Sequence, residues 1–167
     1  MLDHCRTMAR YNRWMNARIY EACARLSDDD RKRDMGAFFG SIHGTLNHLL
    51  LVDRLWMGRF LGEPYPIRSL DQELCSGFAT LRDEREREDA RIVEWIDSLS
   101  AEDVEGELTY TSAMDRQPRH FPFRLALAHF FNHQTHHRGQ VTTLLSQNGV
   151  DPGVTDLIWL PEETRPR

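Results

Sequence analysis

The stretch Ala128-His-Phe-Phe-Asn-His-Gln-Thr-His-His-Arg-Gly-Gln140 holds four of the eight histidines of this 167-residue chain. Each residue of an α-helix turns by about 100°, so His129, His133 and His137 lie within roughly 80° of one another and form a stripe. Neutral imidazole is a frequent ligand of divalent transition metals. The spacing therefore predicts a helix that presents imidazoles along one side, with a metal ion as their common partner.

The i, i+4 pair His133/His137 has the spacing of the zincin motif His-Glu-x-x-His. Here the residues between the two histidines are Gln-Thr-His, so the glutamate that serves as general base in those proteases is missing. A lone histidine on an apolar helix is more often a core or surface residue than a ligand, but a pair with further histidines beside it favours a metal. The pattern predicts a metal site without protease chemistry.

The composition is that of a single globular domain, expected to span residues 1–167. Hydrophobic residues make up 40% of the chain and charged residues 28%, which excludes a disordered or membrane-embedded chain. A net charge of −5 gives no electrostatic reason to bind nucleic acid. No apolar run suits a signal peptide or a membrane span, and three scattered cysteines are typical of reduced thiols. We expect a cytoplasmic protein that binds neither nucleic acid nor membrane.

Apolar residues recur at helical spacing in four segments and predict an all-α domain. The expected helices cover residues 2–26, 38–61, 69–99 and 122–147. Ser69-Leu-Asp-Gln72 has the capping-box pattern for the start of the third, and Asn148-Gly149 is a stop for the fourth. Alternation over residues 107–121 predicts a short β-hairpin before the last helix, which must pack on the helices to be stable. The tail segment 157–160 is expected to pack back onto the helices.

Two histidines on the segment 38–61 compete for the role of third ligand. On a helical wheel Leu51, Val52 and Leu55 lie within roughly 60° of His48. His43 points about 140° away from it. His48 is therefore expected to face the interior, and His43 to face outward or toward a neighbour. Asp53 lies off the stripe and is expected to cap a helix or form an ion pair. The predicted metal ligands are His48, His133 and His137.

The other polar residues of the histidine-rich stretch are expected to support these ligands. His129 and Gln140 are candidates for orienting them through hydrogen bonds. His136 is rotated by roughly 100° from His137, so the two cannot comfortably bind the same ion. Arg138 is expected to form a structural ion pair, with an anionic substrate or a neighbouring subunit as the alternative partner.

Polar residues also occur in the apolar seams of the first and third helices. Asn12 either fixes helix register or lines a polar cavity. The run Arg82–Asp89 carries opposite charges at helical spacing, which is typical of a solvated face. Within it, Arg85 and Glu88 occupy positions that the apolar register would bury, so an approach to the cavity or to a subunit contact is the alternative.

With these residues in place, nearly the whole chain resembles the DinB/YfiT-like family of metalloenzymes. The likeness rests on Tyr11-Asn-Arg-Trp-Met-Asn16, Phe38-Phe-Gly-Ser41, Thr45-Leu-Asn-His48 with Asp53 and Trp56, and Asn132-His-Gln-Thr-His-His-Arg-Gly-Gln140. The resemblance implies an antiparallel four-helix bundle with a long crossover connection. It also implies metal binding by His48, His133 and His137, and a homodimer.

The function stays open among four possibilities. Three protein ligands leave a coordination position for a small-molecule substrate, and zinc, nickel and iron are all suited to imidazole. Some relatives resemble thiol-dependent S-transferases or isomerases, which implies a low-molecular-weight thiol as cofactor and a small electrophile as substrate. A metal-dependent hydrolase is the first alternative. A non-catalytic metal-binding stress-response or interaction module is the second, and histidines that serve only packing and dimerisation are the last.

Overall fold

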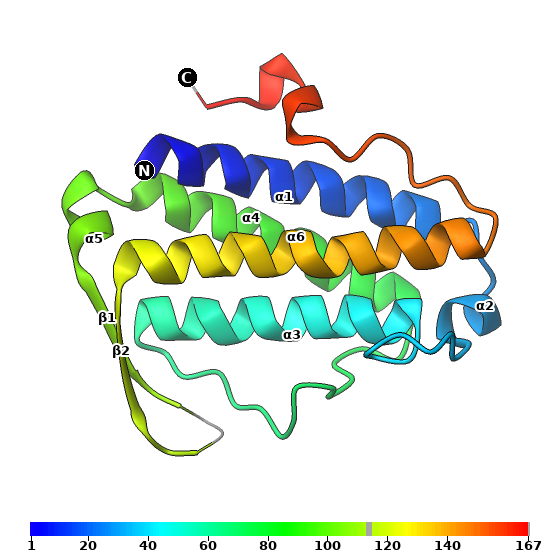
Figure 1. Ribbon diagram of the computed structural model, residues 1–167, viewed down its shortest axis with the longest axis horizontal. Coiled ribbons are helices and arrows are strands. Elements are labelled where there is room, and N and C mark those ends of the chain that lie inside the picture. Colours follow the sequence, from blue (N-terminus) through cyan, green and yellow to red (C-terminus); the bar gives the residue numbers. More distant parts are fainter. Residues whose placement is uncertain (113–114, 167) are drawn as a thin grey trace.

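In the computed structural model, which describes residues 1–112 and 115–166, four long helices pack side by side (Figure 1). They are α1 (Leu2–Cys23), α3 (Ile42–Leu61), α4 (Phe78–Ser98) and α6 (Phe123–Gln147). The α1 and α6 helices run in one direction and α3 and α4 in the other, while the 62–77 segment runs back along the bundle to join α3 to α4. This is the expected all-α antiparallel bundle with a long crossover connection.

Shorter elements lie in the connections and the tail. They are α2 (Asp28–Lys32), α5 (Ala101–Glu105), β1 (Glu107–Thr111), β2 (Pro118–Pro122) and the 3-10 turns η1 (Leu157–Trp159) and η2 (Glu162–Thr164). The two strands pair antiparallel with Leu108 opposite Phe121, and they lie at the end of the bundle where α6 begins (Figure 1). The predicted hairpin is thus confirmed. Within the described ranges, no helix is long and apolar enough to cross a membrane.

The limits of α3 follow from its flanking residues. The Ser41 hydroxyl accepts a hydrogen bond from the backbone N–H of Gly44 at 3.0 Å, which caps the first turn. The helix therefore begins at Ile42 rather than at Phe38, where the apolar pattern placed it. Gly62 ends it in the left-handed region at φ 69°, a conformation that glycine adopts without strain.

The predicted start of the third long helix is wrong. The segment Ser69–Gln72 forms turns, and α4 begins only at Phe78. Its capping-box pattern is defeated by tertiary contacts, because the Asn47 side chain on α3 accepts hydrogen bonds from the backbone N–H groups of Leu74 and Cys75 at 2.8 and 2.9 Å. These bonds satisfy the backbone of the connection without a helix and hold it against α3.

The core of the bundle is apolar toward both ends and polar at its waist. On α6, for example, Leu127 and Phe131 belong to one apolar cluster and Val141 and Leu145 to the other. All four long helices contribute buried polar side chains to the waist: Asn12, Asn16, His48, Asp53, Arg85, Glu88, Asp89, Gln134, His137 and Arg138. Burying so many polar groups destabilises a fold unless they find partners, so their contacts decide what the waist does.

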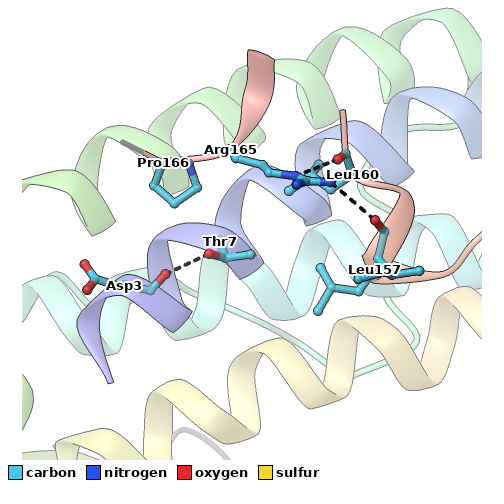
Figure 2. Close-up of a pocket in the computed structure, with 7 residues that line it drawn as sticks. Asp3, Thr7, Leu157, Leu160, Arg165 and Pro166 are labelled. Atoms are coloured by element: carbon cyan, nitrogen blue, oxygen red, sulfur yellow. Dashed lines mark hydrogen bonds between the residues drawn. The ribbon is translucent and has the colours of Figure 1, made fainter. Parts of the chain in front are cut away.

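Of the tail segment 157–160, Leu160 is buried in the core as expected, whereas Leu157, Ile158 and Trp159 are exposed. A cavity of about 740 Å³ lies between this segment and the first turns of α1 (Figure 2). Arg165 points into the segment itself, where its side chain donates hydrogen bonds to the carbonyl groups of Leu160 at 3.0 Å and Ile158 at 3.4 Å. None of the histidines lines this cavity, and its arginine is already engaged, so it is a consequence of tail packing.

Candidate metal centre

Three histidines from two helices converge at the waist. His48 comes from α3, and His133 and His137 come from successive turns of α6. One ring nitrogen from each lies within 4.8 Å of the others, and the Nε2 atoms of His48 and His133 are 3.2 Å apart. Two nitrogens bound tetrahedrally to one metal at about 2.1 Å would lie about 3.4 Å apart. The cluster therefore has the donors and the spacing to hold a metal ion.

Hydrogen bonds fix the rings of two of these histidines. The Nδ1 atom of His48 is 2.8 Å from the carbonyl oxygen of Leu70, which can only accept, so Nδ1 carries the proton and Nε2 a lone pair. The Nδ1 atom of His137 is likewise 2.8 Å from Oε1 of Gln140. An acceptor on the far nitrogen of a metal-binding histidine sets its tautomer and orientation. Both Nε2 atoms are thereby left free for a shared ligand.

The third ring, His133, is held less firmly. It is partly exposed, and its Nδ1 atom is buried without a hydrogen-bond partner in the described chain. The other side of the cluster is closed by Phe39, whose ring stacks on His48 with 3.7 Å between centroids. The cluster is thus covered by Phe39 on one side and reached by solvent past His133.

Burial keeps all three imidazoles neutral at neutral pH. Loss of hydration lowers the pKa of His48 to about 4 and that of His133 to about 3, with the neighbouring imidazoles adding to the effect. Burial also lowers the pKa of His137. A protonated imidazole has no lone pair to share, so these shifts favour the form that binds metal.

The two doubtful residues of α3 lie outside the cluster. His43 is buried rather than turned to solvent, with Nε2 at 2.9 Å from the carbonyl oxygen of Cys75 and 3.1 Å from Oε1 of Glu73. The prediction that His43 lies away from the His48 stripe is correct. It was expected to face either outward or toward a neighbour, and it faces a neighbour. Asp53 forms the expected ion pair, at 2.5 Å from Arg85.

For the supporting residues of α6, the prediction is correct for Gln140 and wrong for His129. Gln140 orients His137, as expected. His129 does not orient a ligand: it is exposed, and its ring lies against that of Trp56 at 5.0 Å. His136 is exposed and within hydrogen-bonding distance of Gln140, and it takes no part in the cluster.

The buried charges form a second polar region on the other side of the waist. Arg85 lies 2.5 Å from Asp53 and 3.0 Å from Asp89. Glu88 is buried as well, so the prediction of a solvated face is wrong for these positions of α4. Their neighbours along the helix, such as Arg82, remain at the surface.

Arg138 belongs to the same region. Its guanidinium donates to the side-chain oxygen of Asn12 at 2.6 Å and lies over the ring of Tyr11. It makes this hydrogen bond in place of the direct ion pair that was expected, and Asn12 holds two helices together rather than lining an open cavity. The amide of Asn16 extends the region by donating to Asp89 at 2.9 Å.

Sequence reasoning missed three contributors to the cluster. The carbonyl of Leu70 was assigned to a helix, Asn47 had no assigned role in holding the connection, and Phe39 was expected within α3. The Gly62-Glu-Pro-Tyr-Pro66 break was a signal that the chain becomes irregular here. A backbone carbonyl as partner of His48 leaves no signal in residue identity.

Comparisons with known proteins agree over the length of the chain. Residues 1–167 match the model of the DinB family. The chain is also 24% identical over 170 residues to Protein DinB of Bacillus subtilis (strain 168), and the alignment covers 93% of this chain and 92% of that protein. The match includes both helices that carry the histidine cluster. This chain belongs to the DinB family.

Proposed function

We propose that His48, His133 and His137 bind one divalent metal ion (zinc, nickel or iron) in a metal-dependent enzyme that acts on small electrophilic molecules with a thiol as cosubstrate. One observation carries the proposal: three neutral imidazoles meet with their donor nitrogens within 4.8 Å. Two of their rings are oriented by acceptors on the far nitrogen. If the histidines served packing alone, their donor nitrogens would not need to converge.

A divalent ion held by three imidazoles would keep a coordination position for substrate and would lower the pKa of a bound thiol or water. The chain supplies the setting for that chemistry. Leu70 and Gln140 hold two rings in place, and Phe39 covers the side of His48. The partly exposed His133 marks the side from which a small molecule can approach. The likeness to thiol-dependent relatives favours an S-transferase or isomerase over a hydrolase.

The metal is tested by analysing protein purified without chelator. We expect about one equivalent of zinc, nickel or iron per chain, and we expect His48→Ala to abolish binding. His43→Ala is the matched control, because His43 is a buried histidine on the same helix that lies outside the cluster. Less than about half an equivalent with no binding on titration would contradict the proposal, as would metal loss in His43→Ala alone.

The reaction class is tested with the metal-loaded protein, a low-molecular-weight thiol and 1-chloro-2,4-dinitrobenzene. We expect thioether formation that stops on chelation and returns when metal is restored. Hydrolysis of an activated ester without thiol would instead favour a hydrolase. Stoichiometric metal without turnover of either substrate would favour a non-catalytic metal-binding module.

A further inference from the structure

Beyond the histidines, α3 carries an arginine that is held between two aromatic rings. The guanidinium carbon of Arg59 lies 4.5 Å from the ring centre of Trp56 and 4.3 Å from that of Tyr110. Trp56 is on the preceding turn of α3 and Tyr110 is on β1, so the hairpin supplies one side of the clamp. Rings on its faces fix a guanidinium in place while leaving its N–H edge available.

Arg59 lacks the partner that a half-buried cation normally has. Within residues 1–112 and 115–166, no carboxylate lies at ion-pair distance from its guanidinium, and burial lowers the pKa of Arg59. By contrast, Arg54, which is half-buried on the same helix, pairs directly with Glu84 and Glu88. The unpaired N–H edge of Arg59 therefore retains its capacity to bind an anion.

The guanidinium lines a pocket of about 230 Å³ between α3, the 62–77 connection and β1. Leu55 and Gly58 form its floor on α3, and Tyr65 and Thr109 lie on its other sides. This volume suits one end of a small molecule, such as a carboxylate or phosphate with a few attached atoms. Because Arg59 is the only charged residue that lines it, the pocket favours an anion.

This pocket lies on the same side of α3 as the histidine cluster. Arg59 follows His48 by eleven residues with a rotation of only about 20°, and its guanidinium lies over the ring of Trp56, about 12 Å beyond His48 along the helix. Aromatic rings continue between the two places, because Trp56 lies 5.0 Å from His129 and His129 lies 6.1 Å from His133, ring centre to ring centre. Because His129 is exposed and His133 is partly exposed, a small molecule at the histidines can extend toward Arg59 along this surface.

We propose that Arg59 binds an oxyanion, a carboxylate or a phosphate, at the far end of the thiol or substrate whose reacting end lies at His48, His133 and His137. The inference rests on the proposed function and adds a substrate class to it. Ligands of this site carry an anionic group about 12 Å from the reacting atom. Arg59 is then a specificity-determining residue and takes no part in bond making.

The test uses cobalt-substituted protein, whose absorption spectrum changes when a thiol binds the metal. The probes are 8-mercaptooctanoate and 8-mercaptooctyl phosphate, long enough to span the distance, and neutral 8-mercaptooctanol. A second pair, 3-mercaptopropionate and 3-mercaptopropanol, is too short. We expect the long anionic thiols to bind at least about tenfold more tightly than the long alcohol, since a charge-assisted contact contributes that much. The short pair should show no such preference.

Variants of Arg59 separate recognition from packing. In Arg59→Met the long anionic and neutral thiols should bind equally, with the affinity for 8-mercaptooctanol unchanged, and Arg59→Lys should keep part of the preference. Arg124→Met is the matched control, because this arginine lies at the same end of the bundle and pairs with Glu105. It should keep the full preference. The stronger of the two long anions identifies carboxylate or phosphate as the natural group.

Three results would overturn the inference. The first is a preference for anionic thiols that survives in Arg59→Met, and the second is a preference that is equal for short and long thiols. The third is weaker binding of charged and neutral thiols alike in Arg59→Met, which would mean that Arg59 only holds the hairpin. Failure of the proposed function looks different: no thiol, charged or neutral, would change the cobalt spectrum of the wild type. That result would overturn both proposals.

Discussion

The waist of the bundle contains two buried polar regions that differ in how their groups are satisfied. In the charged region, Arg85 lies between Asp53 and Asp89, and the opposite charges meet in contacts of 3.0 Å or less. In the histidine cluster, the rings of His48 and His137 use Nδ1 for a neutral acceptor, and Nε2 of His48 lies 3.2 Å from Nε2 of His133. The charged region pairs cations with anions of the same chain, whereas the histidine cluster brings together three ring nitrogens that can share a metal ion.

This difference separates a structural region from a functional one better than burial does. Both regions are buried and both use all-polar contacts, so neither polarity nor position identifies the site. What identifies the site is that its polar groups can still bind a ligand. By the same criterion Arg59, clamped but unpaired, belongs with the histidines, whereas the equally charged Arg85 does not. Mutations that remove one residue from each region test this difference.

The largest expected effect is on the charged region. Arg85→Met leaves the carboxylates of Asp53 and Asp89 buried without their shared cation, which should lower the free energy of unfolding by about 3–5 kcal/mol. Urea denaturation of the metal-free protein measures the change. Arg82→Met, on the exposed side of the same helix, is the control and should change the value by less than about 0.5 kcal/mol. Equal effects of the two variants would show that the charged region does not hold the bundle together.

The sequence was sufficient to predict most of the fold, because helical periodicity is a local property. The segments around α1, α3 and α6 and the hairpin were all identified, and Asn148-Gly149 ends α6 as its chemistry requires. The failure at the start of α4 has a physical cause. Whether Ser69–Gln72 caps a helix depends on competing hydrogen bonds from Asn47, which lies on another helix and cannot be inferred from local pattern.

The candidate site was predictable to the extent that helical geometry determines direction. The wheel argument separated His48 from His43, and the structure brings His48, His133 and His137 together. The hydrogen-bond partners of these rings were harder to predict from the sequence. A carbonyl such as Leu70 O has no residue signature. The apolar register places Arg85 inward, but its partners Asp53 and Asp89 cannot be inferred until the packing of α4 against α3 is known.

A smaller effect is expected from loosening one ligand. Gln140→Leu removes the acceptor for Nδ1 of His137 and should weaken metal binding by about 10- to 100-fold, the usual cost of losing such a partner. Competition titration against a chelating indicator measures the affinity. His136→Ala, which removes the other neighbour of Gln140, should leave the affinity unchanged. A greater loss in His136→Ala would make His136 the ligand and contradict the assignment of His137.

The smallest effect is the pH dependence of stability in chelator-treated protein. Burial lowers the pKa of His48 to about 4 and of His133 to about 3, so between pH 7 and 6 these imidazoles bind more protons in the unfolded chain than in the folded one. Each of them then lowers the stability by about 0.7 kcal/mol over this interval, while burial raises the pKa of Asp53 to about 7, so its protonation opposes that loss. Urea denaturation at the two pH values measures the loss.

Comparison with His48→Gln isolates the histidine contribution, because the buried carboxylates and all other titrating groups are common to both proteins. The variant should lose about 0.7 kcal/mol less than the wild type between pH 7 and 6, and His133→Gln should behave in the same way. An identical pH dependence in wild type and variant would mean that these imidazoles are as well hydrated as in the unfolded chain. The contrast between a neutral, open cluster and a self-neutralised charged region would then be wrong, since the histidines would have no burial cost for a metal to offset.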